Sequence, residues 1–274
     1  MFDKVLKECY HNMVIKYKFT EEYIMFNKAS FKVNAYPTRK EMGLAAAEDC
    51  KNKIIELLKE KDEINMIFAA APSQNEFLES ILECKEIDFT RINAFHMDEY
   101  IGLPAGAPQG FGQFLKDRLF GKAPFKSVNY LNGNAEDPQA ECERYSKLLR
   151  ENPTDIVCLG IGENGHIAFN DPHVCFFNDE AMVKIVELDN VCRQQQVNDG
   201  CFNSLDEVPT HALTLTVPTL KNVDCHICIV PAKTKAEAVK NTVYGEITEK
   251  CPASIMRLCK DVNIYLDADS SSLL

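Results

Sequence analysis

The stretch INMIFAAAPSQNEFLESILEC, residues 64–84, contains the pattern that decides the fold. The apolar run over 64–71 predicts a strand that is buried on both faces. Pro72 interrupts this run, and residues 73–76 (SQNE) match a capping box, which marks the start of a helix. The apolar stripe of that helix consists of Phe77, Ile81 and Cys84. A buried strand, a tight turn and an amphipathic helix predict an α/β unit.

Strands and helices alternate through the rest of the chain. Further strands are predicted over 91–97, 155–160, 183–188, 212–217, 225–230 and 263–266. Helices are predicted over 41–60, from 137–138 onward, and over 235–243. Near-continuous apolar strands that are separated by helices are typical of a mostly parallel sheet with helices on both faces. We therefore predict an α/β fold of this kind.

Length, composition and charge limit the class of protein. A chain of 274 residues fits two average domains or one large α/β domain, and since no linker or repeat interrupts it, we predict a single domain over 1–274. The hydrophobic share of 46% excludes a disordered chain. The net charge of −11 argues against a general surface for nucleic acids or anionic membranes. An anionic small molecule stays possible, because a few cations in a pocket outweigh distant charge.

The sequence predicts a cytoplasmic location and reduced thiols. Its apolar runs fall short of the roughly 20 residues of a spanning helix, and the first residues, MFDKVLKECYHNM, lack the pattern of a secretory signal. The 12 cysteines are evenly spread, which indicates reduced core cysteines. Residues 225–228 (CHIC) have the spacing of zinc ligands, but no second pair follows them. We expect no metal site.

Polar loops follow the predicted strands, at the sheet edge where α/β proteins bind ligands. Asp98 leaves a buried strand, where a carboxylate can serve as a general base or simply cap a turn. His166 lies in the glycine-rich loop 160–172, with Asn164 and Asp171 near enough in sequence to orient its ring for proton transfer. A buried structural histidine is the alternative.

The loop over 69–75 precedes a predicted helix N-terminus, whose free N–H groups suit a phosphate. Ser73 either caps this helix or binds the anion. These loops together predict a pocket that combines proton transfer with anion binding.

Several motifs resemble, in the same order, those of the glucosamine-6-phosphate deaminase/isomerase family, and they extend over roughly residues 60–245. They are 97–100 (MDEY) with 102–104 (GLP), 131–135 (LNGNA), 141–145 (ECERY), 165–170 (GHIAFN) with Pro172, 212–214 (ALT) and 235–236 (KA). The related 6-phosphogluconolactonases share the Gly-His loop but normally lack the MDEY motif and the AFN continuation.

The resemblance implies a Rossmann-like three-layer sandwich and the conversion of glucosamine 6-phosphate and water to fructose 6-phosphate and ammonia, without a cofactor or metal. Asp98 would move the proton between C2 and C1, His166 would assist ring opening, and Arg193 and Lys235 would hold the phosphate. The predicted catalytic residues are Asp98, His166, Asn164 and Asp171. The predicted substrate-binding residues are Ser73, Gln74, Asn75, Gly165, Arg193 and Lys235.

The sequence also departs from the family pattern. The family usually has Asp where this chain has Asn164, and Glu where it has Asp171; its glycine-rich phosphate turn is replaced by 69–75 (AAAPSQN), and 191–202 diverges as well. These changes leave two alternatives open: an enzyme for another sugar phosphate, such as galactosamine 6-phosphate, or a sugar-phosphate sensor without catalysis. The family contains monomers and hexamers, so homo-oligomerisation and allosteric regulation also stay open.

Overall fold

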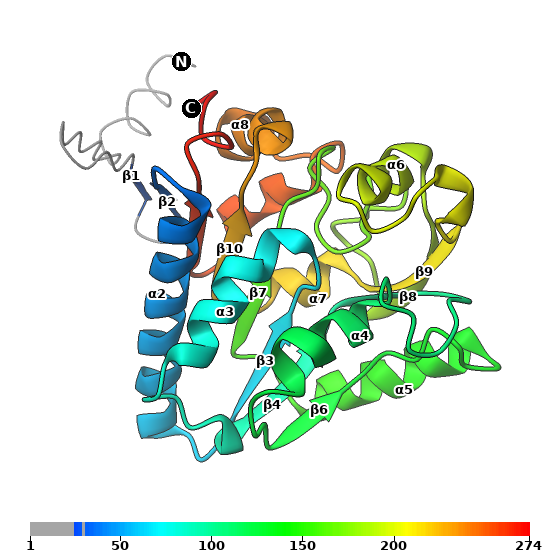
Figure 1. Cartoon of the computed structure of the whole chain (residues 1–274), viewed down its shortest axis with the longest axis horizontal. Coiled ribbons are helices and arrows are strands. Elements are labelled where there is room, and N and C mark those ends of the chain that lie inside the picture. The colour runs from blue at the N-terminus through cyan, green and yellow to red at the C-terminus, as the bar shows by residue number, and fades with distance from the viewer. Residues whose placement is uncertain (1–24, 29–30) are drawn as a thin grey trace.

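A computed structural model describes residues 25–28 and 31–274 and has an eight-stranded sheet between two layers of helices (Figure 1). In sheet order the strands are β1 (Met25–Lys28), β2 (Phe31–Ala35), β11 (Val262–Leu266), β10 (Cys225–Val230), β7 (Ile156–Leu159), β3 (Ile64–Phe68), β4 (Ile92–His96) and β6 (Ser127–Asn129). Neighbouring strands are parallel except β1 and β2, which are antiparallel. The predicted mostly parallel sheet is therefore confirmed.

Alternating side chains of the central strands supply two separate cores. Met66 and Phe68 of β3 pack in one core, whereas Ile67 between them packs in the other. Helices α2 (Arg39–Glu60), α3 (Asn75–Glu83) and α4 (Phe111–Leu115) cover the first core. Helices α5 (Pro138–Glu151), α7 (Val217–Lys221) and α8 (Ala236–Tyr244) cover the second. Helices thus lie on both faces, as the sequence predicts.

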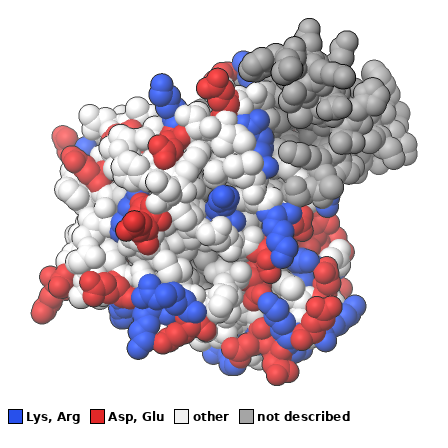
Figure 2. Space-filling model, turned by 180° about the vertical axis from the view of Figure 1, so that it is seen from behind, with Lys and Arg blue, Asp and Glu red and all other residues white. Residues whose placement is uncertain are grey.

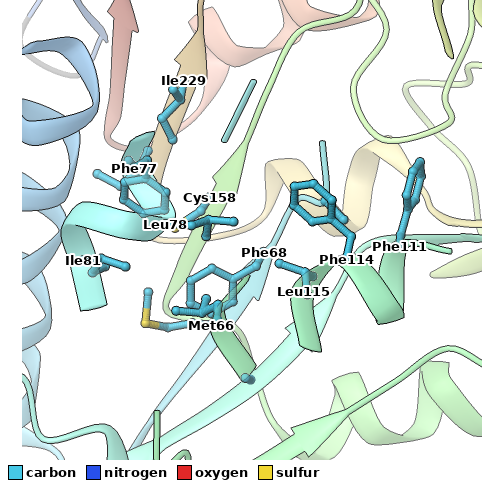
Figure 3. Packing of buried hydrophobic residues seen from close by; sticks show 14 of the residues in the cluster. Met66, Phe68, Phe77, Leu78, Ile81, Phe111, Phe114, Leu115, Cys158 and Ile229 are labelled. Carbon is cyan, nitrogen blue, oxygen red and sulfur yellow. The ribbon is translucent and has the colours of Figure 1, made fainter. Parts of the chain in front are cut away.

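Figure 3 shows part of the first core. Side chains of α3 pack over β3, β7 and β10, and those of α4 lie next to them. The labelled residues are Met66, Phe68, Phe77, Leu78, Ile81, Phe111, Phe114, Leu115, Cys158 and Ile229. Of the predicted apolar stripe, Phe77 and Ile81 are buried here, whereas Cys84 follows the last residue of α3 and is only partly buried.

Two predicted strands belong to a second, smaller sheet. The central strand of this sheet is β9 (His211–Leu215), which pairs antiparallel with β8 (Val183–Glu187) on one side and with β5 (Asp98–Tyr100) on the other. A strand pattern does not reveal its partner, so the sequence alone places β8 and β9 in the parallel sheet. Helix α6 (Asn190–Asn198) follows β8 and lies over the same end of the molecule (Figure 1).

The predicted capping box at 73–76 is wrong. Residues Pro72–Gln74 form a short 3-10 turn, and α3 begins at Asn75 without a side-chain cap. Glu76 instead accepts hydrogen bonds from Arg39 of α2. A tertiary contact therefore replaces the local cap that the SQNE pattern predicts.

The surface carries charge of both signs. On the face opposite to that of Figure 1, acidic and basic side chains are interspersed (Figure 2), which is typical of a solvated surface. Among the helices of the described residues, none combines the length and apolar character that crossing a membrane requires. Every cysteine in this part of the chain is a free thiol, in line with the predicted reduced core cysteines.

Candidate active site

The strand order reverses between β3 and β7, because the chain continues from β3 to β4 on one side and returns to β7 on the other. In open parallel sheets ligands bind at the carboxyl ends of strands at such a point. A pocket lies there, and the ends of β3, β4, β7 and β10 contribute to it. Its lining consists of Arg39, Ala69–Ser73, Met97, Asp98, Phe111, 160–162, His166, Ala168, Phe169, Gln195, Gln196, Asp199, Pro231, Ala232 and Lys235.

The ring of His166 occupies space that only a glycine at position 162 leaves open. A Cβ atom at Gly162 would lie 2.1 Å from His166 Cε1. His166 Nδ1 lies 2.8 Å from Asn164 Oδ1 and 3.1 Å from Asp171 Oδ1. Since both neighbours are acceptors, Nδ1 carries the proton and Nε2 is left as a base.

Asn164 and Asp171 form the support for this histidine. Asn164 Nδ2 donates to Asp171 Oδ1 at 2.8 Å, so that its own Oδ1 faces His166. Burial opposes ionisation of Asp171, but His166 and hydrogen bonds from His166, Asn164 and Cys192 outweigh burial and lower the pKa of this carboxyl. Asp171, which is one methylene shorter than the Glu usual in the family pattern, therefore still reaches His166.

Asp98 is the first residue of β5 and lines the pocket. It is 6% exposed, and burial together with the neighbouring Glu99 raises the pKa of its carboxyl well above the ordinary value. Glu99 itself accepts from the backbone N–H groups of Phe111 and Gly112, which ties the 101–112 loop to the strand. A carboxyl group with a raised pKa, facing a pocket, is suited to taking and returning a proton.

The small sheet brings Asp98 and the histidine loop together. Thr214 of β9 is the register partner of Asp98, and its Oγ1 accepts a hydrogen bond from Phe169 N at 3.0 Å. Asn170 Nδ2 donates to Leu215 O of the same strand at 2.8 Å. One antiparallel strand thus fixes both polar loops.

Lys235 lies at the start of α8 with only 5% exposure, and burial lowers the pKa of its ammonium group, although Asp199 and Glu163 oppose this. Its Nζ lies 3.7 Å from Glu163 Oε1 and has no hydrogen-bond partner among the described residues. A buried ammonium group with free donors, facing a pocket, suits an anionic ligand.

Arg193, the other predicted phosphate ligand, does not line the pocket. Its guanidinium donates to Val208 O at 2.9 Å and to Leu205 O at 2.7 Å, and so holds the loop that follows α6. The residues of α6 and its end that do face the pocket are Gln195, Gln196 and Asp199.

The remaining predicted binding residues have different positions. Ser73 lines the pocket, whereas Gln74 lies beneath it and donates to Ser73 Oγ and Ile229 O. Asn75 accepts from Arg118 at 2.9 Å. Gly165 has a φ of +83°, and its carbonyl accepts from Ala253 N, so it shapes the loop behind the pocket.

Comparison with known proteins identifies the relatives of this chain. The model of the family described as "Glucosamine-6-phosphate isomerases/6-phosphogluconolactonase" matches residues 37–265. The chain belongs to this family. A glucosamine-6-phosphate deaminase of Listeria welshimeri is 36% identical over 212 residues, covering 77% of this chain and 88% of the relative. One of Streptococcus gordonii is 33% identical over 243 residues, covering 89% and 99%.

Solved structures of the glucosamine-6-phosphate isomerase/6-phosphogluconolactonase family have the same fold. A structure described as a monomeric glucosamine-6-phosphate deaminase has a TM-score of 0.79 at 31% identity and covers 88% of this chain and 99% of that one. A 6-phosphogluconolactonase from Thermotoga maritima has a TM-score of 0.69 at 21% identity, covering 86% and 98%. The predicted family and its Rossmann-like sandwich are confirmed.

Sequence reasoning missed several residues that line the pocket in this family member: Arg39, Phe111, Phe169, Gln195, Gln196 and Asp199. A signal for Arg39 exists, because Thr38 and Glu41 have the spacing of a capping box and Thr38 Oγ1 does accept from Glu41 N. This pattern indicates that the helix begins at Arg39, two residues before the start of the predicted helix over 41–60. The aromatic residues carry no such signal, since most aromatic side chains simply fill a core.

One group of possible metal ligands occurs in the described part of the chain. His166, Asp171 and Cys192 offer a nitrogen, an oxygen and a sulfur atom that lie within 4.8 Å of one another. Burial raises the pKa of the Cys192 thiol, with Asp171 contributing, so the thiol is protonated and lies against that carboxylate. Asp171 therefore bonds both to His166 and to Cys192, and this network continues the support of His166.

Proposed function

We propose that the protein is a glucosamine-6-phosphate deaminase, which converts glucosamine 6-phosphate and water to fructose 6-phosphate and ammonia. The observation that carries the proposal is the common pocket of Asp98, His166 and Lys235, which offers a carboxyl group, an oriented imidazole and a buried ammonium group to one ligand. The relatives named for this activity support glucosamine over its epimer galactosamine.

In the first step of the proposed reaction, His166 opens the sugar ring. Its Nδ1–H is held by Asn164 and Asp171, so Nε2 is free to exchange a proton with the ring oxygen and the C1 hydroxyl. Because Asn164 is neutral, the charge that stabilises a protonated ring comes from Asp171 alone.

In the second step Asp98 removes the proton from C2 of the open aldehyde and returns it to C1 through an enolamine. The C2–H bond breaks, the aldehyde oxygen takes up a proton from water, the C1–H bond forms, and C2 becomes an iminium carbon. Water then adds to C2 and ammonia leaves, which gives fructose 6-phosphate. A buried Asp98 with a raised pKa suits both directions of this transfer, since the carboxylate is a stronger base than usual.

Simultaneous measurement of ammonia and fructose 6-phosphate released from glucosamine 6-phosphate tests the proposal. Both products should appear in equal amounts. Asp98→Asn should stop turnover while fructose 6-phosphate still binds, because asparagine keeps the shape but cannot take the proton. The proposal fails if the wild-type protein binds the substrate and releases neither product.

We also propose that residues 1–274 form a single domain and that the protein acts in the cytoplasm. The family match over 37–265 supports one domain. One structural relative is described as monomeric. Light scattering of the purified protein tests whether this chain forms homo-oligomers.

A further inference from the structure

Two of the residues that line the pocket carry a lysine or arginine side chain, and they are Arg39 and Lys235. Helix α6 and its end contribute neutral amides and the exposed carboxylate of Asp199 to the same wall. A phosphate dianion is usually bound by arginine forks or lysine ammonium groups. Arg39 supplies the guanidinium in this lining.

Helix packing brings Arg39 to the pocket. Thr38 caps α2, so Arg39 is the first helical residue, and Gly43 lies one turn further on. A Cβ atom at Gly43 would lie 2.6 Å from Glu76 Cβ, so the glycine lets α2 approach the first turn of α3. Figure 1 shows these two helices side by side. The close approach places Arg39 beside the turn between β3 and α3.

The guanidinium of Arg39 is held in one orientation. Its Nε and Nη2 donate to the two carboxylate oxygens of Glu76 at 2.8 and 3.0 Å, and Nη2 also donates to Pro72 O at 3.0 Å. Nη1 has no partner among the described residues. The fork is thus fixed on one side and leaves donors for a ligand on the other.

We propose that Arg39 binds the phosphate of the substrate together with Lys235, and that Glu76 orients the guanidinium. This inference rests on the proposed function and names a substrate-binding residue in place of Arg193, which does not line the pocket. Arg39 acts on binding and takes no part in the proton transfers. Its removal should therefore raise KM and leave kcat nearly unchanged.

Calorimetric titration of inorganic phosphate and of fructose 6-phosphate measures this contact without turnover, and steady-state kinetics measures KM and kcat. Arg39→Gln should raise both dissociation constants, and KM, about 10- to 100-fold, the range expected for a hydrogen-bonded charge. Arg39→Lys keeps the charge without the fork and should give a smaller increase. Glu76→Gln is the matched control, because it breaks the same ion pair and keeps the arginine.

The inference is overturned if Arg39→Gln raises the dissociation constants less than about fivefold, well below a charged hydrogen bond. It is also overturned if Arg39→Gln and Glu76→Gln lower Tm equally and weaken binding equally, since Arg39 then serves only as a partner for Glu76. If Arg39→Gln does not fold, Arg39→Lys decides instead, and dissociation constants equal to those of the wild-type protein then overturn the inference. A wild-type protein that binds phosphate through Arg39 but releases no ammonia contradicts the proposed function alone.

Discussion

Replacement of Gly162 by alanine should remove most activity without unfolding the protein. The added Cβ would lie 2.1 Å from Cε1 and 2.3 Å from both ring nitrogens of His166. Ordinary carbon contacts are about 3.5–4.0 Å, so the ring must move by more than about 1 Å. The 2.8 Å contact between Nδ1 and Asn164 Oδ1 then breaks. A displacement of about 1 Å at a catalytic group costs roughly 100-fold in rate.

A double-mutant cycle with His166→Ala distinguishes this cause from general damage. Steady-state deamination of glucosamine 6-phosphate gives kcat for Gly162→Ala, His166→Ala and the double variant, and thermal unfolding checks that each is folded. Because the alanine acts through the ring, it should cost almost nothing once His166 is absent. Two results would contradict an effect through the His166 ring. One is a folded Gly162→Ala variant that keeps kcat within about threefold of the wild-type value, and the other is a double variant whose loss of kcat equals the product of the two single losses.

Three other predictions concern charge and loop structure. The raised pKa of Asp98 should shift the acidic limb of the kcat/KM profile above that of an ordinary aspartate, since the base works only when deprotonated; a limb at an ordinary aspartate pKa, about 3.9, contradicts this. The lowered pKa of Asp171 should stabilise the fold fully above the unfolded value of about 3.9, and this contribution should vanish as pH falls through the folded value. Unfolding of wild-type protein and Asp171→Asn should therefore differ less in acid; a constant difference rejects the linkage. Arg193→Ala should lower stability by about 1–3 kcal/mol through lost carbonyl contacts and leave KM unchanged, whereas a raised KM in a stable variant would return Arg193 to the phosphate site.

Features that depend on neighbours along the chain could be predicted from the sequence. The apolar run over 64–68 and the helix after it follow from local hydrophobic patterns, which is why the parallel sheet was predicted correctly. The support of His166 is also local, because Asn164 and Asp171 lie within seven residues of each other. Local geometry could therefore bring these groups together without knowledge of the whole fold.

Packing between distant elements determines which side chains share the pocket. Arg39 reaches the pocket because Gly43 permits close packing of α2 on α3. The packing brings Gly43 against Glu76, and these two residues lie 33 positions apart in the sequence. Arg193 stays out of the pocket because its guanidinium donates to Leu205 O and Val208 O in the loop after α6. The small antiparallel sheet likewise depends on pairing that strand composition does not encode. Side-chain type is written in the sequence, but orientation and partner are set by packing.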